Sequence, residues 1–164
     1  MSETYLEPAA WFATLPSAFI SASMLLTDAD DRVLLVKPNY RPGWNFPGGI
    51  AEENETPHDC AAREIAEELG LSVEPGDLLV VHWSPPLGER PRPLVNFLFD
   101  GGVVADPSRI RVQAEELDEV AFLPWEEGIA LLPSSTSARL RTARLARADG
   151  HPHYLAGGSD ETAE

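Results

Sequence analysis

The sequence has little cysteine, little positive charge and no long apolar stretch. Cys60 is its single cysteine, so no disulfide bond can form within the chain, and a reducing, cytoplasmic setting is expected. No apolar run approaches the ~18–20 residues of a membrane span, and the first fifteen residues contain no lysine or arginine, unlike the basic start of a secretory signal. We therefore do not expect a membrane or secreted protein.

Basic residues are outnumbered by acidic ones, 12 to 27, and the formal net charge is −15. A chain this acidic is poorly suited to hold a nucleic acid duplex through phosphate neutralisation, so no such partner is expected. Between Gly49 and Leu71, seven carboxylates accompany a single base, Arg63. Such a cluster repels itself unless a cation is present, and a divalent cation is the usual solution.

The length of 164 residues is typical of one domain. We expect an N-terminal lead-in over 1–16, a single domain over 17–149 and a mobile C-terminal tail over 150–164. Apolar patterning and turn residues predict strands and helices. The predicted strands are 17–27, 32–37, 77–83, 94–100 and 118–123, and the predicted helices are 56–69, 124–131 and 134–148. A bulge or turn is expected at Gly101 and Gly102.

The first of these helices carries the strongest signals. Thr56 can cap it, and Gly70 can end it. Glu64, Glu67 and Glu68 are three and four residues apart and therefore lie on one helix face. Like charges at this spacing destabilise a purely structural helix, so the spacing favours a cation site.

A loop rich in proline and glycine, residues 38–49, precedes this helix. Gly48 and Gly49 allow close approach of the backbone, and a carbonyl there can complete a metal site. Mg²⁺ binds through carboxylates, water and substrate phosphates, and Mn²⁺ is the alternative ion. Hydrolysis of a diphosphate requires neutralised charge and a deprotonated water, which a metal ion and a spare carboxylate supply.

The segment from Gly49 to Leu71 reads G-x5-E-x7-R-E-I-x-E-E-x-G-L and resembles the Nudix box at every fixed position. The resemblance implies an α/β fold, namely an α/β/α sandwich around a mixed sheet. It also implies hydrolysis of a phosphoanhydride bond in a nucleoside diphosphate linked to a moiety X. The implied catalytic residues are Arg63, Glu64, Glu67 and Glu68. The implied metal-binding residues are Gly48, Glu64, Glu67, Glu68 and Glu116, with Glu64 as either a ligand or the general base.

Candidate substrate contacts lie outside the box: Trp44, Phe46, His82, Trp83, Arg90 and Arg92. Trp44 and Phe46 can stack on a base, although core packing is the favoured role. The arginines can bind phosphates. The X moiety stays open among ADP-ribose, nucleotide sugars, dinucleoside polyphosphates and nucleoside triphosphates. An apolar N-terminal segment is a candidate homodimer interface.

Two alternatives come from other classes of function. An isoprenyl-diphosphate isomerase would need a reactive thiol in its pocket, and Cys60 is badly placed for that role. A nucleotide-sensing module would bind its ligand without cutting it, which the complete carboxylate set disfavours. The arginines of the last helix, residues 139–147, are expected on a solvated face.

Overall fold

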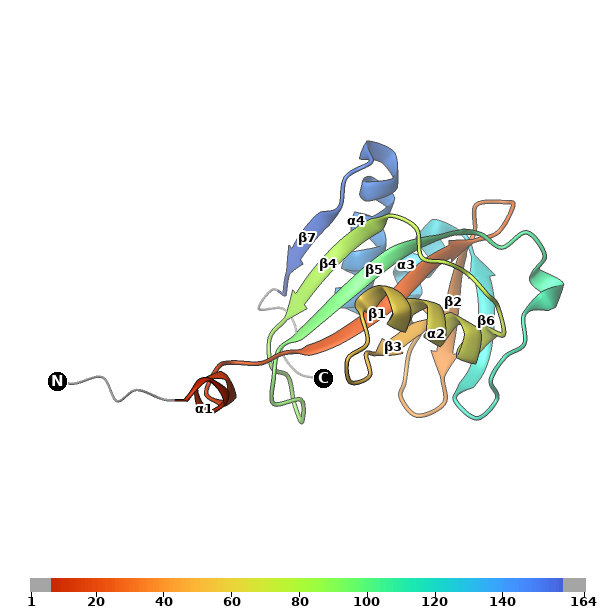
Figure 1. Ribbon diagram of the computed structural model, residues 1–164. Coiled ribbons are helices and arrows are strands. Elements are labelled where there is room, and N and C mark those ends of the chain that lie inside the picture. Colours follow the sequence, from red (N-terminus) through yellow and green to blue (C-terminus); the bar gives the residue numbers. More distant parts are fainter. Residues whose placement is uncertain (1–6, 158–164) are drawn as a thin grey trace.

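The computed structural model describes residues 7–157, and within them a seven-stranded sheet lies between helices (Figure 1). The strands are β1 (Phe19–Thr27), β2 (Val33–Pro38), β3 (Gly48–Ile50), β4 (Leu78–Ser84), β5 (Leu94–Val103), β6 (Leu117–Leu123) and β7 (His153–Ala156). The helices are α1 (Pro8–Ala13), α2 (Pro57–Leu69), α3 (Trp125–Leu131) and α4 (Ser134–Asp149), with a 3-10 turn at Pro107–Arg109.

The sheet is mixed, as expected. Its strand order is β6-β2-β1-β5-β4-β7, and the short β3 pairs with β1 outside this path. The pairs β1–β5 and β4–β7 are parallel, and the remaining pairs are antiparallel. The pairing of β3 with β1 places Gly49 opposite Ala22 and so fixes the glycine strand in the centre of the molecule.

Alternating side chains of β1 supply two separate cores. Met24 and Leu26 pack with Ile65 on the α2 side, whereas Leu25 packs with Leu140 on the α3 and α4 side. This follows from the two-residue period of a strand, which sends successive side chains to opposite faces. Full burial of each large apolar side chain contributes roughly 1.5–3 kcal/mol. Two cores on two faces of one sheet make the fold an α/β/α sandwich.

The predicted strands and helices agree with the structure to within three residues at each end. The bulge expected at the paired glycines is present, because β1–β5 pairing passes from Leu25–Asp100 to Leu26–Gly102 and leaves Gly101 as the extra residue. Strand β3 was not predicted. It has only three residues, too few for a recognisable alternation.

The C-terminal prediction needs correction, because part of the expected mobile tail forms β7 in parallel with β4, with His153 opposite Val80. His153 Nε2 also lies 2.8 Å from Asp149 Oδ2. The rest of that tail, 158–164, lies outside the described residues, as does 1–6 of the lead-in. The described part of the lead-in forms α1, where Trp11 and Phe12 are exposed. In residues 7–157, no helix is long and apolar enough to cross a bilayer.

Candidate active site

Helix α2 begins and ends where its sequence predicts. The backbone N–H of Asp59 donates to Thr56 Oγ1 at 3.1 Å, and Gly70 closes the helix in the left-handed region with a φ of 64°. Ile65 and Leu69 are buried against the sheet. Because this apolar side is fixed, the side chains of the neighbouring face lie beside β3 and the cavity next to it.

The two glycines of β3 permit this close approach. Gly48 has a φ of 143°, and a Cβ at this position would overlap the carbonyl oxygen of Ala22 and the backbone of Ser23. A Cβ on Gly49 would overlap the carboxylate of Glu64. The N–H of Gly48 donates to Glu68 Oε2 at 2.9 Å, so the glycine strand directly orients one of the box carboxylates.

Arg63 joins the loop to the helix through a network of carboxylates. Its Nε and Nη2 donate to Glu55 at 2.8 and 3.0 Å, and its Nη1 donates to Glu64 at 2.9 Å and to Glu67 at 3.0 Å. The Arg63 hydrogen bonds and the N–H of Glu52 lower the pKa of Glu55 to about 2. A bidentate guanidinium fork suits this arrangement, which a lysine cannot reproduce.

A cavity of about 540 Å³ lies between α2, the sheet and α4. We name three of its lining residues, Glu64, Glu68 and Glu116, the carboxylate wall. Burial, with the nearby charges of Glu64 and Glu116, raises the pKa of Glu68 to about 8, although the Gly48 N–H acts in the opposite direction. Burial also raises the pKa of Glu64. Glu67 lies outside this lining and is half-exposed beside Arg63.

The carboxylate wall has the donor chemistry of a hard divalent cation, which takes oxygen ligands. Burial is the main cause of the raised pKa of Glu68, and the charges of Glu64 and Glu116 add to it, so a nearby cation would favour the ionised form of this group. Within residues 7–157, however, no three His, Cys, Asp or Glu side chains are already close enough together to hold a metal ion. The carboxylate wall therefore offers donors of a suitable type, and its side chains would have to move closer together to bind one cation.

The cavity also has a floor of buried polar side chains, which motif-based prediction missed apart from His82. This polar floor consists of Ser21, Ser23, His82, Ser84 and Asn96. Asn96 Nδ2 donates to Ser21 Oγ at 2.8 Å and to Ser23 Oγ at 3.3 Å. The period-two pattern of β1 was the available signal, because Ser21 and Ser23 share a face with the apolar Leu25.

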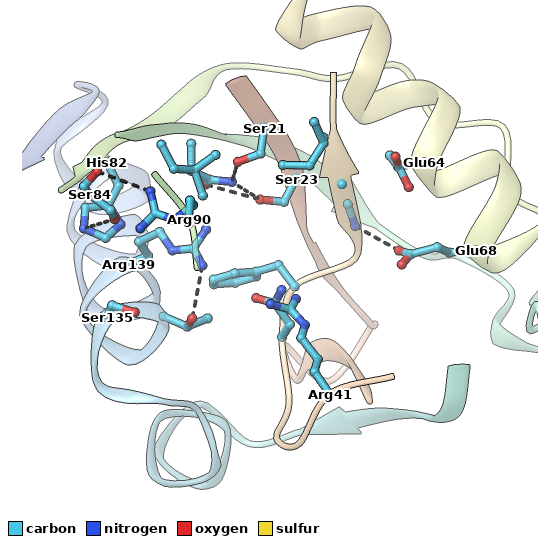
Figure 2. A pocket seen from close by; sticks show the side chains of 18 of the residues that line it. Ser21, Ser23, Arg41, Glu64, Glu68, His82, Ser84, Arg90, Ser135 and Arg139 are labelled. Atoms are coloured by element: carbon cyan, nitrogen blue, oxygen red, sulfur yellow. Dashed lines mark hydrogen bonds between the residues drawn. The ribbon is translucent and has the colours of Figure 1, made fainter. Parts of the chain in front are cut away.

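Arginines complete the cavity. Arg90 and Arg139, which we name the arginine wall, lie on the side opposite Glu64 and Glu68, and Arg41 lies between the two walls (Figure 2). Arg90 was a predicted substrate contact. Arg139 was expected on a solvated face, and the structure corrects that prediction. Its guanidinium lies 5.6 Å from the ring centroid of Phe46.

The predicted substrate residues divide into two groups. Phe46, His82 and Arg90 line the cavity, whereas Trp44, Trp83 and Arg92 are not among its lining residues. Trp44 packs against the α4-side core, and Arg92 is exposed with its guanidinium 5.7 Å from the Phe19 ring centroid. Trp83 alternates with His82 and Ser84 along β4 and therefore points to the other face of the sheet. The structure thus gives no support to a substrate contact by these three residues.

Cys60 is buried within α2 and lies outside the cavity lining. Its Sγ is 3.6 Å from the carbonyl oxygen of Gly49, and burial raises the pKa of the thiol to about 11. A thiol with a raised pKa is a poor nucleophile and a poor acid–base group at neutral pH. The structure therefore disfavours the thiol-dependent isomerase alternative.

The α/β/α sandwich, with an arginine–glutamate helix against a glycine strand, defines a Nudix-type hydrolase. The comparisons with known proteins agree. A family model described as NUDIX domain matches residues 18–144, and the chain belongs to this family.

Two curated relatives are hydrolases. The chain is 27% identical over 124 residues to an RNA pyrophosphohydrolase from Hydrogenovibrio crunogenus. The aligned region covers 64% of this chain and 71% of that protein. It is 29% identical over 140 residues to a CMP-5'-(N-acetyl-N-hydroxy-3-aminopropyl)phosphonate hydrolase from Streptomyces rubellomurinus. This aligned region covers 80% of this chain and 63% of that protein. The chain thus spans less than two thirds of the second relative.

A solved structure with the same fold is the NUDIX domain of Shewanella oneidensis NrtR in complex with ADP ribose. It superposes with a TM-score of 0.68 at 18% sequence identity, covering 87% of this chain and 99% of that one. At this level of identity the similarity shows the fold alone.

Proposed function

We propose that this chain hydrolyses a phosphoanhydride bond in a nucleoside diphosphate linked to a moiety X, with Mg²⁺ or Mn²⁺ as cofactor. The observation that carries the proposal is that Glu64, Glu68 and Glu116 all line one cavity of about 540 Å³. Ligand pockets for small molecules typically have volumes of about 300–1,000 Å³. The cavity is therefore large enough for a nucleotide derivative beside the carboxylates.

In this proposal the cation would be held by Glu64, Glu68, Glu116 and the carbonyl of Gly48. Glu67 belongs to the proposed set as well, and it would have to leave its 3.0 Å contact with Arg63. A bound divalent cation neutralises charge that develops on the phosphate oxygens and makes water more acidic. The chain's own contribution is to place the carboxylates on one side of the cavity, where a bound cation would favour their ionised forms.

Arg63 orients Glu64 through the 2.9 Å hydrogen bond from Nη1 to Oε1. Besides a ligand role, Glu64 has the features of a general base, because burial raises its pKa and it lines the cavity. In that role its carboxylate accepts the proton of the water that attacks phosphorus. Glu55 holds Arg63 in place from the loop, so the network is a positioning device for the reacting groups.

The two relatives support the proposed type of bond, since one is a pyrophosphohydrolase and the other a hydrolase of a CMP derivative. A second candidate is a module that binds a nucleotide without cutting it. The NrtR domain, crystallised with ADP ribose, shows that this fold can hold such a ligand. The carboxylate wall favours the hydrolase.

We also propose the extent of the domain, the cellular location and a candidate dimer contact. The hydrolase domain would begin at residue 17 and extend beyond the predicted boundary at 149, so that it includes β7. A reducing, cytoplasmic location accords with the single, buried Cys60. The exposed Trp11 and Phe12 of α1 keep the N-terminal segment a candidate for contacts in a homodimer.

Glu68→Gln tests the proposed function directly. Without the Glu68 charge, turnover should fall by at least about 100-fold in saturating Mg²⁺, while the thermal unfolding curve stays cooperative. Glu53→Gln is the matched control, because Glu53 is exposed in the preceding loop and lies outside the cavity. A Glu68→Gln protein that turns over like the wild type would contradict the assignment.

A further inference from the structure

The cavity is electrically two-sided. Three carboxylates and three guanidinium groups line it, although acidic residues outnumber basic ones 27 to 12 in the chain. Figure 2 shows Arg90 and Arg139 on one side of the cavity and Glu64 and Glu68 on the other. In the proposed function the cation lies at the carboxylate wall, and the diphosphate whose charge it neutralises lies beside it. The arginine wall is therefore left for a different part of the substrate.

Arg90 is held in position by the backbone. Its Nη2 donates to the carbonyl of Pro85 at 2.8 Å, and its Nη1 lies 3.2 Å from the carbonyl of Arg92. In residues 7–157, no Asp or Glu oxygen lies within 4.0 Å of its charged group. A partly buried guanidinium fixed by neutral carbonyls keeps its positive charge available for an anion.

Arg139 approaches the cavity from α4. Its guanidinium lies over Phe46, and its Nη2 donates to Thr136 Oγ1 at 3.1 Å. These contacts restrict the side chain before a ligand arrives, which reduces the entropy lost on binding. The first turn of α4 also lines this wall and adds the positive end of the helix dipole. Arg139 also covers one face of Phe46, so a nucleobase cannot stack on that face.

The polar floor connects the two walls. Ser21, Ser23 and Asn96 are at most 8% exposed, and they form their hydrogen bonds among themselves. Burying a polar group without a hydrogen bond costs free energy, and these mutual hydrogen bonds offset that cost. Hydroxyl and amide groups suit an uncharged polar section, such as a sugar, between two anionic ends.

We propose that the arginine wall is a second anion subsite and that the substrates are nucleotide derivatives carrying a further phosphate or carboxylate beyond the scissile diphosphate. The inference rests on the proposed function, which assigns the diphosphate to the carboxylate wall. It narrows the X moiety to anionic members, because the positive charges of the arginine wall stabilise an anion more than an uncharged group.

Paired substrates that differ by one anionic group test the subsite. UDP-glucuronate is compared with UDP-glucose, and coenzyme A with dephospho-coenzyme A. The wild type should favour the anionic member of at least one pair by about 10-fold or more in kcat/KM, as expected for a charge-assisted hydrogen bond. Arg90→Gln and Arg139→Gln should lower that preference to about 3-fold or less.

Arg141→Gln is the matched control, because it removes the same charge from the same helix outside the cavity. Arg139→Lys keeps the charge and should restore part of the preference. Thermal unfolding of every variant shows whether the fold is intact. A wild type without any anionic preference, or an equal fall for both members of each pair, would overturn the subsite while leaving the hydrolase proposal standing.

A metal-free measurement separates the two proposals if neither pair is hydrolysed. Isothermal titration calorimetry with inorganic pyrophosphate in EDTA should show binding that Arg90→Gln and Arg139→Gln each weaken by about 10-fold. Glu68→Gln should not weaken it, because no cation is present. Binding that is absent, or that does not depend on either arginine, would refute the anion subsite on its own.

Discussion

The two walls of the cavity are built in different ways. The carboxylate wall is largely local, because one helix supplies Glu64 and Glu68, and Arg63 and Gly48 orient these residues. The arginine wall is assembled from the loop after β4 and from α4, which are distant in the sequence. Residues that lie close together in the sequence can form a motif with fixed spacing, whereas residues brought together by tertiary contacts do not. A sequence motif therefore predicted Glu64 and Glu68, whereas no motif predicted that Arg139 lines the same cavity.

The first prediction targets the geometry of the carboxylate wall. Gly48→Ala should destabilise the protein by about 3–4 kcal/mol, because its φ of 143° is strained for alanine and the new Cβ would meet the backbone of β1. Denaturant unfolding measures the loss. Gly88→Ala is the control, with a φ of 54° and open space around the new Cβ, and it should lose only about 1 kcal/mol. Equal losses of stability in the two variants would show that the close approach of β3 to β1 does not require glycine at position 48.

Arg63→Lys keeps the positive charge beside the carboxylate wall but removes the guanidinium fork. A lysine cannot hold Glu55 and Glu64 together, so kcat should fall by about 100-fold, which corresponds to about 2.7 kcal/mol. Stopped-assay kinetics at saturating Mg²⁺ measure this change, with circular dichroism as a check on the fold. If kcat stays within about 2-fold of the wild type, the fork does not position Glu64.

Asn96→Leu probes the polar floor between the walls. Replacing a buried amide by an apolar group should change stability by no more than about 1 kcal/mol, because Ser21 and Ser23 can bond water in the cavity. KM should rise by about 10-fold if the floor contacts substrate. Steady-state kinetics measures the change in KM, and thermal unfolding measures the change in stability. A large loss of stability with an unchanged KM would make the floor a purely structural network.

The smallest effect is expected from pH. Arg63 lowers the pKa of Glu55 from 4.5 to about 2, so the folded state is favoured by this group above pH 4.5, and the benefit disappears as pH falls from 4.5 towards 2. Glu55→Gln should lower stability by about 1 kcal/mol at pH 7 and by almost nothing near pH 2. Urea unfolding across this range measures the difference. A difference independent of pH would exclude the ion pair as its cause.

Most of the fold was predictable, because the apolar period of two in the strands and the capping residues of α2 report local structure. The box residues also predicted Glu64 and Glu68 of the carboxylate wall. The four-residue spacing of Arg63 and Glu67 predicts that they pair, and the structure confirms this contact at 3.0 Å. Strand β7 was missed because four residues after a glycine carry too little pattern. Arg139 was misassigned because a charged residue on a helix is usually solvated, and only the packing of α4 against the sheet brings it to the cavity.

The most direct test of the central claim is hydrolysis of nucleoside diphosphate derivatives in ¹⁸O-labelled water, with Mg²⁺, with Mn²⁺ and with EDTA. Mass spectrometry of the products reports both the bond that is cut and the atom that is attacked. The account predicts that at least one substrate is cleaved only with a divalent cation present, and that the label enters a phosphate group. No cleavage, or cleavage at the same rate in EDTA, would contradict it.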